Sequence, residues 1–404
     1  MNYTPEEVRE FIEEEDVKFI RLAFCDVFGK QKNISIMPDE LERAFDQGIA
    51  FDASSVEGFG DEIHSDLFLK PDCDTLSVLP WRPGQGRVVR MYSNVFYPDG
   101  RNYECDTRYL LKKAVKKAGD AGVSFRFGVE QEFYLFELDE KGKPTKIPYD
   151  DAGYMDIAPD DKGENIRREI CLTLEQMGIR PESSHHEGGP GQNEIDFRYS
   201  DPLTAADNAM TLQTIVKTVA YRNGLCADFS AKPLENLPGN GFHINFSVVS
   251  KEGCKCMESI IAGVLSKTED MTVFLNRTEE SYHRFGHNRA PKFISWSREN
   301  RSQLVRIPAA EGEYRRAELR SPDPMANPYI CFALMIYAGL HGIENKIPLP
   351  EAFDYNLFKA EFEKAEHLKR LPETLKTARL KAYESDFIRK YIPQTVLDIY
   401  CGKK

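Results

Sequence analysis

The chain has 404 residues, and its 65 aspartates and glutamates outnumber its 53 lysines and arginines, so its formal net charge is −12. The length allows two or three domains with a sizeable core, whereas the acidic balance excludes broad binding to nucleic acid or to an anionic membrane surface, because both require positive charge. No stretch approaches the roughly 20 apolar residues of a membrane helix, and the acidic start is unlike a signal peptide, so we expect a cytoplasmic protein whose nine scattered cysteines are reduced.

A short helix is expected near the N-terminus, followed by a β-hairpin. Thr4 can cap a helix that Pro5 opens, and Glu7 stands where it can complete a capping box. Residues 16–38 then alternate between apolar and polar side chains and break at Gly29, which is the pattern of a hairpin.

Further short strands complete a small N-terminal domain. Residues 75–80 and 87–96 have the composition of strands, and the Tyr-Pro-Asp-Gly sequence at 97–100 is a natural terminating turn. We therefore predict an N-terminal domain at residues 1–98 and a second, larger domain at residues 99–404.

The larger domain combines amphipathic helices with strands. A long helix is expected from Asp106 or Thr107, and apolar side chains recur at helical spacing over 164–179 and from about residue 205 to a stop at Gly224. The Lys- and Glu-rich tail from about Ala352 is predicted to be a solvated, helical packing element.

Four stretches of the larger domain alternate strictly between apolar and polar residues. Their polar faces carry Glu130 and Glu132; Glu194 and Asp196; His243, Asn245 and Ser247; and Arg316, Glu318 and Arg320. Helices interspersed with such strands predict an α+β fold built on an antiparallel sheet, with a site on the polar face of the sheet.

The carboxylates on these faces indicate a divalent metal ion. A glutamate on a single such strand usually faces solvent, but carboxylates that converge cannot all be ionised at close range without a cation. Carboxylates with a single imidazole and no thiolate suit Mg²⁺ or Mn²⁺ better than zinc.

Arginines are concentrated in the same region. The segments 298–306 and 315–320 contain Arg298, Arg301, Arg306, Arg315, Arg316 and Arg320. Guanidinium groups match phosphate oxygens, and together with carboxylate-held metal they favour phosphoryl transfer over the simpler alternative of a salt-bridged surface sheet. Because the chain contains no Walker A sequence and no G-x-G-x-x-G, the nucleotide site must be built differently.

Six segments, ordered along nearly the whole chain, resemble the type I glutamine synthetase family: FDASSVEGF, GVEQEFYLF, SSHHEGGPGQNEIDF, GNGFHINFS, NRSQLVRIP and RRAELRSPDPMANPY. The resemblance implies an N-terminal β-grasp domain and a catalytic domain with a metal-lined funnel. It also implies a homododecamer of two stacked hexamer rings in which neighbouring subunits share each active site.

The resemblance further implies the ligands of the metal ions and of ATP. Two or more Mg²⁺ or Mn²⁺ ions would be held by Glu132, Glu187 and Glu194 and by Glu130, His243 and Glu318. The nucleotide would contact Glu182, Asn245, Ser247 and Arg316, and the transferred phosphoryl group would face Arg301 and Arg306.

The same motifs imply the substrates and their binding residues. Glutamate would contact Gly239, Arg284 and Arg320, and ammonium would be held by Asp52, Ser54 and Ser55 of a neighbouring subunit. The glutamate side-chain carboxylate would attack the γ-phosphate of ATP, and ammonia would displace phosphate from the acyl phosphate, giving glutamine.

Three positions depart from the family pattern. Arg289 stands where the family's lid has a glutamate, Pro238 replaces an asparagine that contacts glutamate, and Asp61 replaces an arginine involved in feedback inhibition in some members. These departures leave two alternatives open: a ligase that joins glutamate to another amine, and a catalytically weak, glutamine-synthetase-like regulatory protein.

Overall fold

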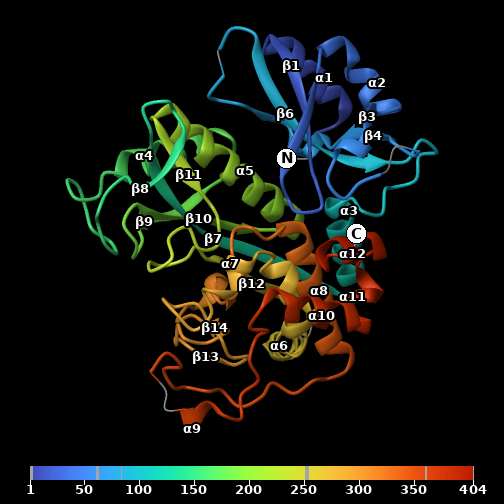
Figure 1. Ribbon diagram of the computed structural model, residues 1–404. Helices are drawn as coiled ribbons and strands as arrows, with labels where there is room; N and C mark the ends of the chain where they lie inside the picture. Colours follow the sequence, from blue (N-terminus) through green and yellow to red (C-terminus); the bar gives the residue numbers. More distant parts are fainter. Residues whose placement is uncertain (1–2, 61–62, 83, 251–253, 360–361, 404) are drawn as a thin grey trace.

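A computed structural model describes residues 3–60, 63–82, 84–250, 254–359 and 362–403. The chain folds around two sheets, one in the N-terminal part and a larger one that carries the polar strands, with the C-terminal helices packed beside both (Figure 1). Asp61 lies outside the described residues.

The N-terminal sheet has six strands in the order β2-β1-β6-β4-β3, with β5 paired to β6. Its elements are α1 (Pro5–Glu14), β1 (Val17–Cys25), β2 (Gln31–Ile36), α2 (Leu41–Asp46), β3 (Ile49–Asp52), β4 (Asp66–Pro71), β5 (Ser77–Val78) and β6 (Arg87–Phe96). The capping box of Thr4 and Glu7 and the antiparallel β1–β2 hairpin are both present, as the sequence predicts. The sheet buries Ile20, Leu22 and Met91 completely.

The larger sheet has nine strands and follows the order β13-β14-β15-β12-β7-β10-β9, with β8 and β11 also paired to β7. These strands are β7 (Val123–Leu138), β8 (Pro144–Pro148), β9 (Pro181–His186), β10 (Gln192–Ser200), β11 (Leu225–Asp228), β12 (Phe242–Ser250), β13 (Trp296–Arg298), β14 (Val305–Ile307) and β15 (Ala317–Leu319). Strands β7, β10, β12 and β15 are antiparallel neighbours, so the polar strands of the sequence lie next to one another.

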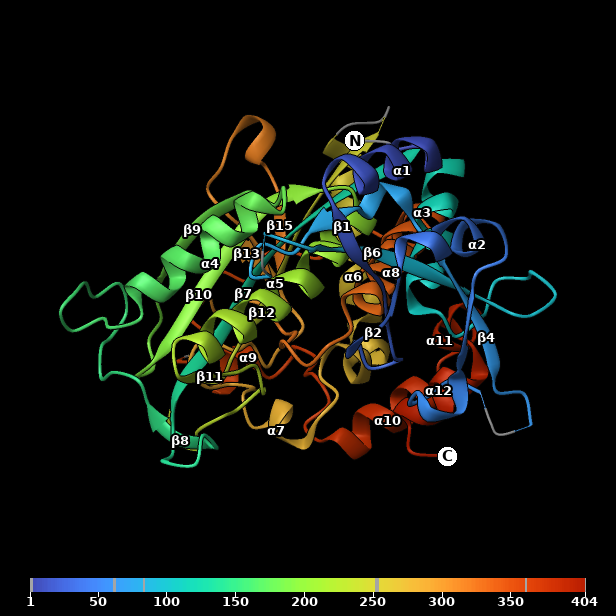
Figure 2. The same cartoon turned by 90° about the horizontal axis from the view of Figure 1, so that it is seen from above.

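Helices cover one face of this sheet (Figures 1 and 2). They are α3 (Thr107–Asp120), α4 (Glu164–Gln176), α5 (Pro202–Arg222), α6 (Cys254–Leu275) and α8 (Pro328–Glu344). The short helix α7 (Glu279–Tyr282) follows α6 in the chain. The apolar sides of the strands pack against them, as in the stacked rings of Phe127 and Phe332, whose centroids lie 4.4 Å apart. The opposite face of the sheet is therefore left for polar side chains.

The boundaries of two helices follow from their caps. Asp106 is the residue that caps α3, by accepting a hydrogen bond from the backbone N–H of Arg108, so Thr107 is its first helical residue. Helix α5 ends just before Gly224, whose φ of +73° is the left-handed conformation that favours glycine.

The C-terminal tail is more buried than the sequence analysis predicts. Its helices are α9 (Phe362–Ala365), α10 (Leu375–Glu384), α11 (Asp386–Tyr391) and α12 (Gln394–Tyr400), and residues 352–359 form no helix. Val396 and Leu397 are fully buried, and the Tyr400 hydroxyl donates to the Val27 carbonyl at 2.9 Å. The predicted helical packing element is present, but solvation is confined to its charged side, because a strip of apolar side chains packs onto the rest of the molecule.

Arg108, at the start of α3, joins the two parts of the chain. Its guanidinium lies 2.8 Å from Asp72 of the N-terminal part and 2.9 Å from Asp207 on α5, and its side chain is 4% exposed. Among the described residues, none of the helices has both the length and the apolar character that crossing a membrane requires.

Candidate functional site

Antiparallel register brings the carboxylates of three strands together. Glu194 on β10 is paired with Glu132 on β7, and His243 on β12 is paired with Glu130 on β7. Because side chains alternate along a strand, all four extend from the face of the sheet that the helices do not cover. They line a cavity of about 470 Å³.

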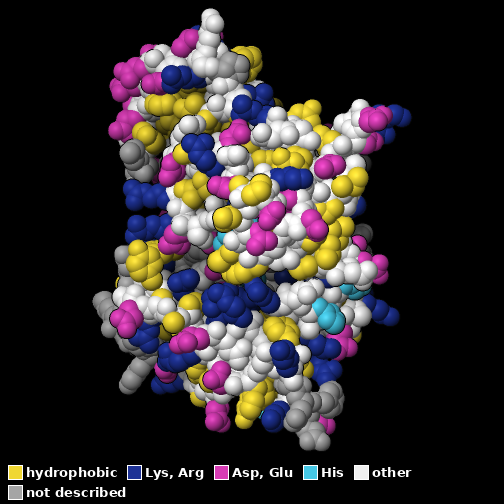
Figure 3. Space-filling view, turned by 90° about the vertical axis from the view of Figure 1, so that its left-hand side faces the viewer, with side chains coloured by type: hydrophobic (Ala, Val, Ile, Leu, Met, Phe, Trp, Pro, Cys, Tyr) yellow, Lys and Arg dark blue, Asp and Glu magenta, His cyan; other side chains and the backbone are white. Residues whose placement is uncertain are grey.

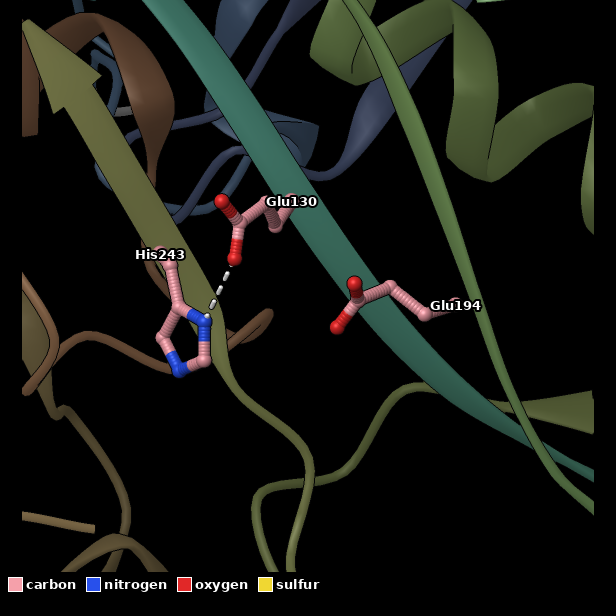
Figure 4. A group of neighbouring side chains, drawn as sticks. All are labelled: Glu130, Glu194 and His243. Atoms are coloured by element: carbon pink, nitrogen blue, oxygen red, sulfur yellow. Dashed lines mark hydrogen bonds and ion pairs between the residues drawn. The ribbon is translucent and has the colours of Figure 1, made fainter. Parts of the chain in front are cut away.

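One group of ligand-type atoms comes from three neighbouring strands. Oxygen and nitrogen atoms of Glu130, Glu194 and His243 lie within 4.8 Å of one another, and their side chains point toward a common space (Figure 4). The His243 ring nitrogen Nδ1 lies 3.1 Å from a Glu130 oxygen, and Asn245 donates to the other Glu130 oxygen at 2.9 Å.

A second group shares Glu194 with the first. His185, Glu187 and Glu194 also offer atoms within 4.8 Å of one another, and His185 Nε2 lies 3.2 Å from Glu194. Glu132 stands beside them and accepts hydrogen bonds from Gln192 at 3.1 Å and from the Gly241 backbone N–H at 2.8 Å. The sequence analysis did not identify His185, although it lies two residues before Glu187, which that analysis names.

The electrostatics of these groups calls for a cation. Burial and the neighbouring carboxylates raise the pKa of Glu194 well above its usual range, and burial and Glu132 raise the pKa of Glu187. Burial would also raise the pKa of Glu130, but His243 and Asn245 outweigh it and the pKa falls. A divalent ion would let all these carboxylates ionise together, so the donor set of oxygens and imidazole nitrogens fits Mg²⁺ or Mn²⁺.

A third histidine–carboxylate group, Asp150, Asp161 and His186, is structural. Asp161 is ion-paired with Arg167, and His186 Nε2 lies 2.9 Å from Asp150. Burial would lower the pKa of His186, but the bond to Asp150 outweighs it and raises the pKa. The other His186 ring nitrogen lies 2.7 Å from the Glu187 backbone carbonyl, which fixes the chain that carries Glu187.

Lysine and arginine side chains gather along a seam on the face in Figure 3. The cavity is lined by Arg284, Arg301, Arg306, Arg316 and Arg320. Two of these, Arg306 and Arg320, bind the carboxylate of Glu318, which is fully buried and lies 3.6 Å from His243 Nδ1. Glu318 therefore lies next to the group of Glu130, Glu194 and His243, and its two oxygens are hydrogen-bonded to Arg306 and Arg320.

Two of these arginines are nearly buried where they line the cavity. Arg284 is 4% exposed and donates to the carbonyls of Ser321 and Pro322, while Arg320 is 1% exposed. The Nε atoms of both arginines are buried and have no hydrogen-bond partner among the described residues. Because both guanidinium groups are cationic and line the cavity, they suit an anionic ligand there.

Gly239 lines the same cavity at a very close packing contact. A Cβ atom there would lie 2.5 Å from the Ala231 carbonyl oxygen and 2.7 Å from Arg284 Cγ, so only glycine fits. The preceding residue, Pro238, accepts a hydrogen bond from the Tyr134 hydroxyl at 2.7 Å.

A second pocket adjoins the first through Arg316, which lines both. Glu182, Asn245 and Ser247 line this second pocket, and Arg316 Nε donates to Asn245 at 2.8 Å. The pocket also contains residues that the sequence analysis did not identify: Arg126, Tyr199 and Tyr314. Arg126 could have been found, because it continues the alternation that carries Glu130 and Glu132.

Asp52 and Ser55 do not line the cavity of their own chain. They lie on an exposed turn that follows β3, where the Asp52 carboxylate accepts hydrogen bonds from the Ser54 backbone at 2.9 Å and from the Ser55 hydroxyl at 2.9 Å. Hydrogen bonds from both serines lower the pKa of Asp52, so it is an exposed, ionised carboxylate.

Arg289 lies at the mouth of the cavity. Its guanidinium lies 4.8 Å from the centre of the Tyr154 ring, and that ring meets the ring of His185 edge to face. The positive charge of Arg289 opposes the rise in the pKa of Glu187 that burial and Glu132 cause. Arg289 is thus turned toward the site.

Comparison with known proteins gives a consistent result. The family model described as "Glutamine synthetase, catalytic domain" matches residues 104–404, and "Glutamine synthetase, beta-Grasp domain" matches residues 16–98. Glutamine synthetases of Staphylococcus aureus and Clostridium saccharobutylicum are each 42% identical, over 419 and 418 residues, covering 100% of this chain and 94% of each relative.

Solved structures resemble the chain over its whole length. A GmaS/ADP complex has a TM-score of 0.89 at 25% identity and covers 100% of this chain and 95% of its own. A glutamine synthetase of Plasmodium falciparum has a TM-score of 0.87 at 22% identity, covering 99% and 95%, and shows the same fold.

Proposed function

This chain belongs to the glutamine synthetase family, and on that premise we propose that it joins ammonia to the side-chain carboxylate of glutamate in an ATP-dependent reaction. The glutamate carboxylate attacks the γ-phosphorus of ATP and releases ADP, and ammonia then displaces phosphate from the acyl phosphate. The observation that carries this proposal is one cavity in which carboxylates and an imidazole from three strands face a set of arginines.

The carboxylate groups are proposed to hold two divalent ions. Glu132, Glu187 and Glu194 would hold one ion, and Glu130, His243 and Glu318 the other. Bound Mg²⁺ or Mn²⁺ would neutralise the phosphate chain and polarise the phosphoryl group that is transferred. Glu318 would have to give up one of its two arginines to join, and His185 is a further candidate ligand because it lies in the second group.

The arginines are proposed to bind different groups, one pair the carboxylates of glutamate and the other the transferred phosphoryl group. The guanidinium groups of Arg284 and Arg320 line the cavity and suit the carboxylates of glutamate, and Gly239 lines the same cavity. Arg301 is exposed to the cavity, and together with Arg306 it would stabilise the negative charge that develops on the transferred phosphoryl group.

The adjoining pocket is proposed to bind ATP. Its wall of Glu182, Asn245, Ser247 and Arg316 combines acceptors for a ribose with a cation for phosphates. Because Arg316 belongs to both pockets, a nucleotide bound there would direct its phosphate chain toward the metal ligands. The aromatic residue Tyr199 offers a stacking surface for the base.

We further propose that each site is completed by a neighbouring subunit in a ring assembly, a homododecamer of two hexamers. Asp52 and Ser55 support this proposal, because they form an ionised, exposed carboxylate turn that takes no part in the cavity of their own chain. Such a turn would hold ammonium at a neighbour's cavity.

One alternative is favoured by a specific observation. Arg289 places a cation at the mouth of the cavity, where the family has a carboxylate, and Pro238 offers no side-chain amide to the substrate. Both features favour a ligase that uses an amine other than ammonia. A regulatory protein without turnover is disfavoured, because the crowded carboxylates destabilise the sheet and would then serve no catalytic role.

The test is product formation by the purified full-length protein. ATP, glutamate and Mg²⁺ are supplied with ammonium, and ADP, phosphate and glutamine are measured. Equal amounts of all three products, dependent on glutamate, are expected. ADP release without glutamine, and without a γ-glutamyl amide when other amines are supplied, would overturn the proposal. A γ-glutamyl amide formed only from another amine would favour the alternative.

A further inference from the structure

The loop that carries Arg289 is held in a strained conformation that directs its side chain into the site. Asn288 and Arg289 have φ values of +45° and +68°, a region that side chains other than glycine rarely occupy. Hydrogen bonds of 2.9 Å across the turn, from the Gly286 backbone to the Ala290 carbonyl and from the Ala290 backbone to the His287 carbonyl, fix this conformation. Such strain persists where the surrounding structure imposes it, and it is concentrated at functional sites.

Arg289 lies against the Tyr154 ring, with its guanidinium carbon 4.8 Å from the ring centre. The planar guanidinium carries several N–H groups, which can bind both oxygens of a carboxylate. Arg289 is exposed and lines the cavity, so its guanidinium is accessible to a ligand that enters.

Arg289 and Lys232 stand at the junction of two cavities. Both line the inner cavity of about 470 Å³ and an outer one of about 1070 Å³. Within the described residues, every carboxylate that lines the inner cavity lies on or next to strands β7, β9 and β10. Glu235 and Glu280 line only the outer cavity. The junction between the two cavities is therefore cationic.

We propose that Arg289 and Lys232 form an anion site on the acceptor side of the cavity, and that the protein also ligates glutamate to short amines that carry a carboxylate, such as glycine. This inference rests on the proposed function, since it requires the acyl phosphate. The anion must be close to the amine, because the carboxylates of the outer cavity would repel a longer acceptor with a distant negative charge.

The reaction balances without a further reactant. The lone pair of the free amine attacks the acyl carbon, the bond from that carbon to the phosphate oxygen breaks, and phosphate leaves. The proton that the new amide nitrogen loses passes to the released phosphate. The products are γ-glutamylglycine, ADP and phosphate from glutamate, glycine and ATP.

The experiment compares glycine with ethanolamine, an amine of similar size and basicity that carries a hydroxyl group in place of the carboxylate, as competing acceptors for the full-length protein with ATP, glutamate and Mg²⁺. Products are separated by mass spectrometry, and the ratio of their kcat/KM values is the readout. Glycine is expected to be preferred by about 10-fold to 100-fold, the effect of one charge-assisted hydrogen-bonded pair. Equal use of the two amines, or a preference for ethanolamine, would overturn the inference.

Variants assign the preference to the junction. Arg289→Gln is expected to bring the glycine-to-ethanolamine ratio close to one, and Lys232→Gln to lower it in part. Arg222→Gln, which removes an arginine of α5 from a surface ion pair with Glu169, serves as the matched control and should leave the ratio unchanged. An unchanged ratio in Arg289→Gln would also refute the inference.

A separate assay distinguishes this inference from the proposed function. Hydroxylamine, a small neutral acceptor, traps the acyl phosphate as a hydroxamate. If the hydroxamate forms but glycine has no advantage, only the acceptor inference fails. If no hydroxamate forms under conditions where the protein is folded and binds ATP, the proposed function fails, and this inference fails with it.

Discussion

Glu194 lies directly opposite Glu132 in the register of antiparallel β10 and β7, so two carboxylates share one cross-strand position. Like charges at such positions destabilise a sheet. Here the pair is nearly buried, with Glu194 7% and Glu132 9% exposed, and the pKa of Glu194 is raised well above its usual range. A pair of this kind is tolerated in a protein that binds a cation between the strands.

The first prediction follows from that pair. Glu194→Gln is expected to lower turnover by on the order of 10²-fold or more, because it removes a proposed metal ligand. Without divalent ions, the variant should be more stable than the parent by about 0.2–1 kcal/mol, since the like-charge repulsion is gone. Thermal unfolding is measured with chelator and then with excess Mg²⁺.

The sign of the change separates this interpretation from a structural one. Mg²⁺ should stabilise the parent more than the variant, and Glu137→Gln, an exposed position on the neighbouring strand β7, should behave like the parent. A variant that is less stable than the parent in chelator, and equally stabilised by Mg²⁺, would show that Glu194 is a structural residue.

The second prediction concerns two arginines of one segment. Arg301 lines the cavity, whereas Arg298 is exposed at the end of β13 and lines none of the described pockets. Arg301→Gln should lower kcat by about 10²-fold to 10³-fold, the effect of losing one donor to developing charge. Arg298→Gln should leave kcat and stability close to the parent values. Similar kinetics for the two variants would exclude a role for Arg301 in phosphoryl transfer.

The sequence predicts the strands that carry the carboxylates well, because their alternation is local. Glu130 and Glu132 lie two residues apart and must share a face wherever the strand pairs. Which strands become neighbours depends on long-range pairing. The sequence indicates this pairing only indirectly, because several strands in the same region carry carboxylates. Tyr154 was missed for the same reason, since the role of an exposed loop tyrosine is seen only when Arg289 is found against its ring.

The position of Glu318 shows a further limit of sequence analysis. Alternation places it correctly beside Arg316 and Arg320, but its complete burial and its bond to Arg306 at 2.6 Å arise from packing of β14 against β15. Likewise, the mixed charge of the tail concealed a buried apolar strip, because burial of a helix face depends on the surface that receives it.

The third prediction tests the shared site. Asp52→Asn and Glu194→Gln are each expected to be inactive, since one loses the carboxylate proposed to hold ammonium and the other a proposed metal ligand. Mixed and reassembled, the two chains should recover part of the parent activity, because some interfaces then unite an intact turn with an intact cavity. Persistent inactivity in assemblies verified by mass to contain both chains would mean that each chain carries a complete site.

The fourth prediction concerns pH and the contact between the two parts of the chain. Burial would raise the pKa of Asp72, but Arg108 and Lys112 outweigh it and hold the pKa below its usual range. A carboxylate with a depressed pKa in the folded state contributes stability above its unfolded pKa of about 3.9, and this contribution is lost as the pH falls through the folded value.

Asp72→Asn should therefore destabilise the protein by about 1–3 kcal/mol at pH 7. Most of the difference should remain at pH 5, and it should shrink as the pH falls to 4 and below. Asp74→Asn, on the neighbouring exposed residue, is the matched control. Denaturant unfolding across this range provides the check, and a difference that grows toward acid pH would contradict the assignment.

The last prediction concerns the charge at residue 289 and the entry of ammonium. Two unit charges about 4 Å apart repel by roughly 4 kcal/mol at an effective dielectric constant of 20, and by less where solvent penetrates. Arg289 is exposed at the mouth of the cavity, so its repulsion of ammonium should be partial and sensitive to salt. At low ionic strength, kcat/KM for ammonium should rise in the order parent, Arg289→Gln, Arg289→Glu. The three values should converge as salt is added, because screening removes the charge difference while leaving any steric effect. If Arg289→Glu is the slowest of the three at every ionic strength, then the arginine assists turnover, for example by neutralising the acyl phosphate, and does not hinder ammonium.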